Sequence, residues 1–166
     1  MTSWNMTWSR FLLIATAAFV VDQATKALAL VLLEPGWPVA VFPGFNLRLG
    51  FNAGASFGML SDTMVGRPLA MAFLTGALTL FLAWMGFKAR APLERTGFAL
   101  IVGGATGNIL DRLRQGVVTD FLDFYWRDWH WPTFNGADIA IFLGAVSILL
   151  AGWKGRRSDK TETPHG

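Results

Sequence analysis

The sequence contains no cysteine, which excludes disulfide bonds, zinc–thiolate sites and a cysteine nucleophile. Its two histidines, His130 and His165, lie far apart, in an aromatic run and in a polar tail, so a metal site built from several histidines is not expected. Charged side chains are also scarce: they make up 15% of the 166 residues, whereas 53% are hydrophobic. A mean hydropathy of +0.42 is typical of a membrane protein.

The net charge of +3 does not indicate a nucleic-acid partner. The basic residues form no single face or tract; they flank the apolar stretches, which is how topology signals are distributed in membrane proteins. We therefore expect no nucleic acid as a partner. We also expect neither a metal nor another cofactor.

Four stretches are long and apolar enough to cross a bilayer, whose core needs about 20 helical residues. They predict an all-α membrane protein: a single integral membrane domain with an antiparallel bundle of four transmembrane helices and a basic tail over residues 154–166. The first stretch should be retained, because a cleaved signal peptide would not carry Asp22 and Lys26 within its apolar core. The predicted spans are residues 11–33, 68–87, 96–113 and 137–153.

The positive residues also predict the orientation of the chain. Lysine and arginine gather in the short connection between the second and third spans and in the C-terminal tail. The positive-inside rule therefore places both termini in the cytoplasm. Residues 34–67 and 114–136 then lie on the outer face of the membrane.

The two outer segments differ in pattern. The stretch VAVFPGFNLRLGFNAGASFGML alternates apolar with polar or small residues, which predicts short strands joined by turns, a small β-like region at the interface. The stretch DFLDFYWRDWHWP is expected to be an interfacial loop, anchored at the headgroup level by its aromatic rings. Anchoring is expected for most of four rings, those of Tyr125, Trp126, Trp129 and Trp131.

Ionisable groups at membrane depth need a partner or a function, because each costs at least about 2.5–3.5 kcal/mol there. Asp22 and Lys26 are four residues apart on one helical face and are expected to pair. Asp111 and Arg112 are adjacent, so each must find its partners elsewhere in the fold.

The third span carries small residues at helical spacing. Gly103 and Gly107 lie one turn apart, and glycine at such positions lets another helix approach closely. We expect both to be packing residues.

Asn135 and Asp138, at the start of the fourth span, allow two interpretations. Asparagine is a favoured N-cap, and an acid three residues later suits the free N–H groups and the helix dipole, so the pair can be purely structural. Alternatively, Asp120 brings a second carboxylate to the same face, and two acids that share a proton can activate water, as in aspartic proteases. Spacing alone leaves open which acid partners Asp138: Asp111, Asp120 or Asp123.

Two other classes of function compete with hydrolysis. Intramembrane charges often mark ion paths, which would indicate a small membrane transporter or channel component. A scaffold whose acids bind a cation is the third possibility. The polar residues gather at the outer boundary rather than along the spans, which argues against a transport path.

Five motifs follow one another along the chain: DQATK, FNAGASFG, GNILDR, VVTDFLDF and FNGAD. In this order they make the chain, from about residue 10 to residue 153, resemble the lipoprotein signal peptidases (signal peptidase II) of bacterial membranes. The resemblance implies an aspartic endopeptidase of the bacterial cytoplasmic (inner) membrane, with its active site near the periplasmic face. It would remove signal peptides from diacylglyceryl-modified prolipoproteins by cutting before the lipid-modified cysteine, so its partners would be these substrates and membrane lipids.

The resemblance also implies roles for individual residues. It implies no catalytic role for Asp123, and an extended loop would point this side chain away from Asp120. Gly136 departs from the family, which more often has an apolar residue there, but removes no catalytic group. The implied catalytic residues are Asp120 and Asp138, the substrate-binding residues are Asn52, Asn108, Arg112 and Asn135, and the supporting residues are Asp22, Lys26 and Asp111.

Overall fold

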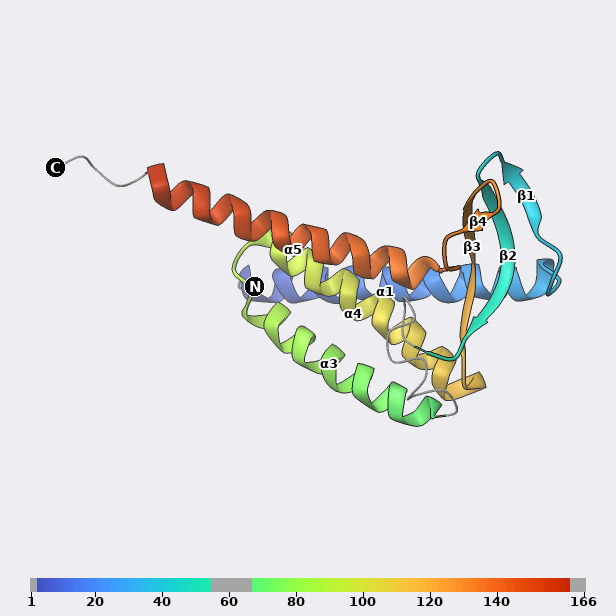
Figure 1. Cartoon of the computed structure of the whole chain (residues 1–166). Coiled ribbons are helices and arrows are strands. Elements are labelled where there is room, and N and C mark those ends of the chain that lie inside the picture. Colours follow the sequence, from blue (N-terminus) through green and yellow to red (C-terminus); the bar gives the residue numbers. More distant parts are fainter. Residues whose placement is uncertain (1–2, 55–66, 162–166) are drawn as a thin grey trace.

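The computed structural model of the chain describes residues 3–54 and 67–161, with side chains over residues 8–54 and 67–154. Four long helices run alternately up and down, and a small sheet lies at the end where α1 ends and α5 begins (Figure 1). In chain order the elements are α1 (Ser3–Leu32), β1 (Val39–Phe42), β2 (Phe45–Asn52), α3 (Pro68–Lys88), α4 (Pro92–Gln115), β3 (Val118–Trp126), β4 (Trp129–His130) and α5 (Gly136–Thr161).

Three helical segments in the described part are long and apolar enough to cross a membrane: Trp8–Leu32, Pro68–Lys88 and Gly136–Lys154. The expected third span falls in α4, which contacts α1, α3 and α5. α4 contains small and polar residues, among them Asn108 and Asp111, and these residues lower its mean hydropathy. Their side chains are buried against the neighbouring helices. The structure therefore supports three spans, and the four-span bundle stays a prediction.

Glycines set the close approach of α4 to α1. A Cβ atom on Gly103 would collide with the carbonyl oxygen of Ala15, and one on Gly107 would collide with the carboxylate of Asp22. Both glycines thus have the packing role expected from their spacing. The short distance between the two helices lets polar side chains of α1 reach α4.

The strands form one antiparallel sheet in the order β1-β2-β3-β4. β1 and β2 make the predicted hairpin, which turns at Gly44 with a φ of 93°. β2 then pairs with β3, and Gly50 lies opposite Asp120. The end of the first predicted β-like stretch, residues 55–60, lies outside the described residues.

The second outer segment is not the interfacial loop that we expected. Residues 118–130 form β3 and β4, which are joined by a tight turn with Arg127 in the left-handed region at a φ of 55°. The pairing of β3 with β2 bridges about 70 residues of chain, and composition alone does not show it. The rings of Trp126 and Trp129 nevertheless remain exposed, as anchoring at an interface requires.

A β-bulge interrupts β3 next to Asp120. The backbone N–H groups of Phe121 and Leu122 both donate to the carbonyl oxygen of Phe134, at 3.0 and 2.9 Å, so two residues face one. Both side chains pack in one apolar cluster against α1. The flanking acids, Asp120 and Asp123, are therefore both directed to the other side of β3, contrary to the expectation that they diverge.

We predict that Gly107→Ala destabilises the protein, because the new methyl group meets the Asp22 carboxylate. Overpacking of this kind costs about 1–3 kcal/mol, which should appear as a lower midpoint of thermal unfolding in detergent. Gly76→Ala is the matched control, since nothing lies within 4 Å of a Cβ atom there. Equal unfolding midpoints for Gly107→Ala and the wild type would show that the packing is looser than described.

Candidate active site

The buried ammonium group of Lys26 lies at the centre of a polar network between α1 and α4. Its Nζ is 2.9 Å from Asp22 Oδ2 and 3.0 Å from Asp111 Oδ2, and it donates to Asn108 Oδ1 at 2.8 Å. A lysine has three N–H donors, so these contacts use all of them. The expected pair of Asp22 and Lys26 is present, whereas the two partners of Lys26 on α4 were not predicted.

Asp111 joins α4 to the start of β3. Its Oδ2 accepts a hydrogen bond from the backbone N–H of Thr119 at 3.1 Å, and its Oδ1 accepts one from Gln23 Nε2 at 3.1 Å. Because Thr119 directly precedes Asp120, this bond fixes the backbone from which Asp120 projects. Sequence reasoning missed Gln23, although it stands in the motif DQATK.

Asp22 also holds the start of α5. Its Oδ1 accepts a hydrogen bond from the backbone N–H of Ala137 at 2.8 Å, which is one of the free donors at the beginning of that helix. The Asp22 side chain therefore bonds α1 to α5 and also packs against Gly107 of α4.

Asn135 and Asp138 form a reciprocal cap at the start of α5. The backbone N–H of Asp138 donates to Asn135 Oδ1 at 3.0 Å, and the backbone N–H of Asn135 donates to Asp138 Oδ2 at 3.2 Å. This is the arrangement of a capping box. The capping arrangement expected for the two residues is thus present.

The same Asn135 side chain also binds the second acid. Its Nδ2 donates to Asp120 Oδ1 at 2.6 Å and lies 3.2 Å from the carbonyl oxygen of Thr119. Asn135 is fully buried between the two elements. Capping and the pairing of two acids are therefore not alternatives, because one amide group serves both.

Asn108 connects Lys26 to Asp138. Its Oδ1 accepts from Lys26 Nζ and, at 3.2 Å, from Asn135 Nδ2, while its own Nδ2 donates to Asp138 Oδ1 at 3.2 Å. An ammonium group bound to the amide oxygen polarises the amide and strengthens its N–H donor. Asn108 and Asn135, which the resemblance implies are substrate-binding residues, are both buried and hold the two acids.

The environment of Asp120 favours its protonated form. Burial, followed by the negative charge of Asp138, raises the pKa of the Asp120 carboxyl to about 7, although hydrogen bonds from Asn135 and Asn52 act in the opposite direction. The side chain is only 2% exposed, so water screens its charge little. One acid of the pair is thus able to exchange a proton near neutral pH.

Asn52 and Arg112 both bind the backbone of Gly54, just beyond the end of β2. Asn52 forms its hydrogen bond to Asp120 and also accepts the backbone N–H of Gly54 at 2.9 Å. Arg112 donates from Nη2 to the carbonyl oxygen of Gly54 at 2.7 Å and from Nη1 to that of Asn108 at 3.2 Å. Within the described residues, its buried Nε has no hydrogen-bond partner. The Nε–H of the guanidinium group is therefore a buried donor that this part of the chain does not satisfy.

Asp123 belongs to a separate cluster on the same strand. Its carboxylate is fully buried, with oxygens 2.9 and 3.0 Å from His130 Nδ1 and 3.4 Å from Asn46 Nδ2. Sequence reasoning missed the contact with His130, because it depends on the turn between β3 and β4. These partners, rather than its direction, separate Asp123 from the other acids.

A model of the family described as signal peptidase (SPase) II matches residues 14–154. The chain belongs to this family. The lipoprotein signal peptidase of Aeromonas hydrophila is 42% identical over 158 residues, which cover 93% of this chain and 94% of that protein. The lipoprotein signal peptidase of Vibrio vulnificus is 39% identical over 163 residues, which cover 94% and 95%. Family membership makes the protein a peptidase and decides against a transporter or channel component.

Solved structures share the fold. A bacterial membrane enzyme determined by the in meso method at 2.3 Å resolution matches with a TM-score of 0.80 and 27% identity, over 95% of each chain. A second, determined by the same method at 1.9 Å resolution, matches with a TM-score of 0.74 and 28% identity, over 86% of this chain and 92% of its own. The helical bundle with its small sheet is thus an architecture that bacterial membrane enzymes use.

We predict that Asp120→Asn stabilises the protein at alkaline pH. The pKa of Asp120 rises from 3.8 to about 7 on folding, so the folded state binds the proton more tightly and loses stability as the pH rises between these values. Asparagine removes this loss. The variant should therefore exceed the wild type at pH 8 by on the order of 4 kcal/mol, and the difference should vanish below about pH 4.

The measurement is the midpoint of thermal unfolding in detergent across this pH range. Asp128→Asn, at an exposed position in the turn between β3 and β4, makes the same chemical change and is the matched control. A parallel pH dependence in Asp120→Asn and the wild type would contradict the raised pKa.

Proposed function

We propose that this chain is an aspartic endopeptidase that removes the signal peptide from diacylglyceryl-modified prolipoproteins, cutting before the lipid-modified cysteine. The observation that carries this proposal is the amide group of Asn135, which binds Asp120 while it caps the helix that presents Asp138. Two acids held together in a buried site suit acid–base activation of water. The names of the Aeromonas and Vibrio relatives support the substrate class.

The two acids have different surroundings, which suggests different roles. Asp138 accepts hydrogen bonds from Asn108 Nδ2 and from the backbone of Asn135, which suits a carboxylate that acts as the base. Asp120, with its raised pKa, carries the proton. We assign the first proton transfer, from water, to Asp138 and the donation of a proton to the carbonyl oxygen to Asp120.

The steps balance in protons and electrons. The water oxygen bonds to the scissile carbonyl carbon while Asp138 takes a water proton and Asp120 donates its own to the carbonyl oxygen. The C–N bond then breaks as the proton on Asp138 moves to the leaving nitrogen. A hydroxyl proton of the intermediate returns to Asp120. One water molecule is consumed, and both acids regain their starting states.

Asn52 and Arg112 are the residues that we assign to substrate contact. Arginine stays charged at any working pH and cannot act as a base, so its unsatisfied Nε suits a substrate carbonyl group. Asn52 lies beside Asp120 at the end of β2. Asn108 and Asn135 are assigned to positioning the acids, because both are buried against them.

We place the sheet on the periplasmic side of the bacterial inner membrane and both termini in the cytoplasm. The short connection between α3 and α4, with Lys88, Arg90 and Arg95 at or near it, lies at the end of the bundle away from the sheet (Figure 1), which suits the positive-inside rule. In this arrangement α4 also crosses the bilayer, as the third of four spans. The acids then lie near the membrane boundary, where a lipid-bound cysteine can reach them while its acyl chains stay in the bilayer.

Asparagine at either acid should nearly abolish cleavage, because it cannot take up or donate a proton as the carboxyl group does. We expect Asp120→Asn and Asp138→Asn each to lower turnover by about 10²–10⁴-fold, and Asp123→Asn to retain most activity. The measurement is cleavage of a diacylglyceryl-modified precursor by purified protein, normalised to folded protein and made with a chelator present.

Each rival interpretation gives its own result in this assay. If Asp138 only caps α5, Asp138→Asn will lower stability modestly and leave turnover per folded molecule intact. If the acids bind a required cation, the chelator will abolish wild-type cleavage. Either result would overturn the proposed pair.

Cleavage should also require the lipid on the substrate. The acids lie next to apolar helices, and each acyl CH₂ group held in an apolar environment contributes about 0.8 kcal/mol to membrane attachment, so loss of two chains should reduce kcat/KM by at least about 100-fold. The comparison is between the lipidated precursor and the same precursor with a short alkyl group on the cysteine. Comparable turnover of the two would contradict the proposed substrate class.

A further inference from the structure

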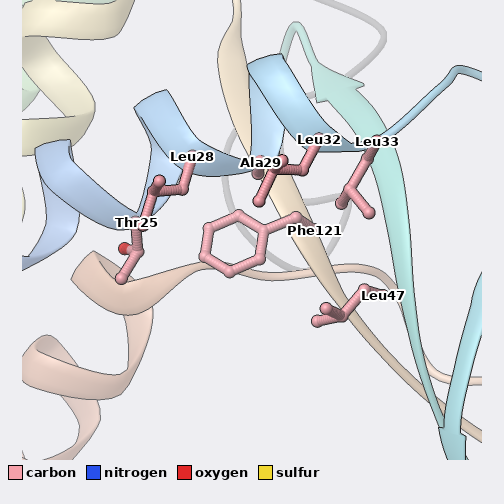
Figure 2. Close-up of a pocket in the computed structure, with 7 residues that line it drawn as sticks. All are labelled: Thr25, Leu28, Ala29, Leu32, Leu33, Leu47 and Phe121. Atoms are coloured by element: carbon pink, nitrogen blue, oxygen red, sulfur yellow. The ribbon is translucent and has the colours of Figure 1, made fainter.

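An apolar pocket of about 250 Å³ lies between α1 and the sheet (Figure 2). The ring of Phe121 forms one wall of the pocket and lies beside the side chains of α1. Thr25, the polar residue of the lining, donates its hydroxyl to carbonyl oxygens of its own helix at 2.9 Å. The pocket therefore suits an occupant without polar groups. Its lining residues are Thr25, Leu28, Ala29, Leu32, Leu33, Leu47 and Phe121.

The pocket is continuous with the surface that the bilayer covers. It occupies the last turns of α1, and the apolar segment Trp8–Leu32 ends beside it. At 1.5 Å per residue, the lining of α1 extends roughly 12 Å along the helix from the membrane boundary. Leu28 and Leu32, at its edge, are 58% and 70% exposed, so they continue the lipid-facing side of the helix. Acyl chains are thus the medium at the mouth of the pocket.

We propose that this pocket binds one acyl chain of a membrane phospholipid, which lies against Phe121 and Leu47. Apolar cavities of about 150 Å³ stay dry and admit hydrocarbon ligands, so water is not the expected occupant. A peptide or a sugar would leave its own polar groups without partners here. The occupant belongs to a phospholipid rather than to the substrate, because Phe121 lines the pocket whereas Asp120, the preceding residue of β3, does not.

The bound chain acts on the site through the bulge in β3. Phe121 directly follows Asp120, and its ring is the wall of the pocket against which the chain packs. An empty space beside the ring would deprive it of contact atoms on one side. The chain therefore holds Phe121, and with it the backbone of Asp120, in place. The binding itself is independent of the reaction that the acids perform.

The test uses a phospholipid that carries a photoactivatable diazirine in one acyl chain, in vesicles of phosphatidylethanolamine and phosphatidylglycerol without substrate. After illumination, mass spectrometry should find lipid adducts on Leu47 or Phe121, in addition to adducts on the lipid-facing Phe73 of α3, which is 80% exposed. The site is assigned by Ala29→Phe, which fills the pocket. This variant should lose the adducts on Leu47 and Phe121 by at least tenfold and keep those on Phe73.

Ala27→Phe is the matched control, because Ala27 is exposed on α1 and does not line the pocket. It should leave all adducts unchanged. If Ala29→Phe does not fold, Leu28→Trp narrows the mouth of the pocket from an exposed position and should reduce the same adducts.

Three results would overturn the proposal. Absence of adducts on Leu47 and Phe121 in the wild type would mean that no acyl chain enters the pocket. Adducts that persist in the filling variants would place the lipid outside the pocket. Loss of the adducts on adding a diacylglyceryl-modified peptide would assign the pocket to the substrate. The labelling requires no cleavage, so its failure is distinguishable from failure of the proposed function.

Discussion

The buried ammonium group of Lys26 is the contact on which the rest of the site depends. One branch of its hydrogen bonds runs through Asn108 to Asp138 on α5, and the other runs through Asp111 to the backbone that precedes Asp120 on β3. Removing one partner of a buried ion pair costs several kilocalories per mole, because the remaining charge is left uncompensated. The positions of two acids on different elements are thus tied to a single cation on α1.

The cap of α5 accounts for the difference between the two acids. Asp138 lies in the first turn of that helix, where the dipole and the backbone N–H groups favour a negative charge. Asp120 projects from a strand, is 2% exposed and lies close to the charge of Asp138. The amide of Asn135 joins the two surroundings, because it binds Asp120 from Nδ2 while its oxygen caps the helix that carries Asp138. The raised pKa of Asp120 comes from its burial and from the charge of Asp138, and the bond from Asn135 opposes it.

Hydropathy and spacing predicted the parts of the fold that depend on local pattern. The apolar runs predicted the helices, and the i,i+4 spacing predicted the pair of Asp22 and Lys26. The spacing of the glycines predicted the close approach of α4 to another helix, which is α1. The motifs also drew attention to most residues of the network.

The rest depends on contacts between distant residues, which a single sequence does not display. The pairing of β2 with β3, the bulge at Phe121 and Leu122, and the contact of His130 with Asp123 all arise from long-range strand pairing or tight turns. The contacts of Asn108 and Asn135 with the two acids are long-range in the same way, and spacing did not predict them. The four-residue spacing of Asp22 and Lys26 has a further consequence for biosynthesis. A helix that precedes its neighbours in the chain leaves the ribosome before they are made, and α1 precedes α4. Because its charges neutralise each other within one turn, α1 can enter the bilayer without waiting for Asp111 of α4 to be translated.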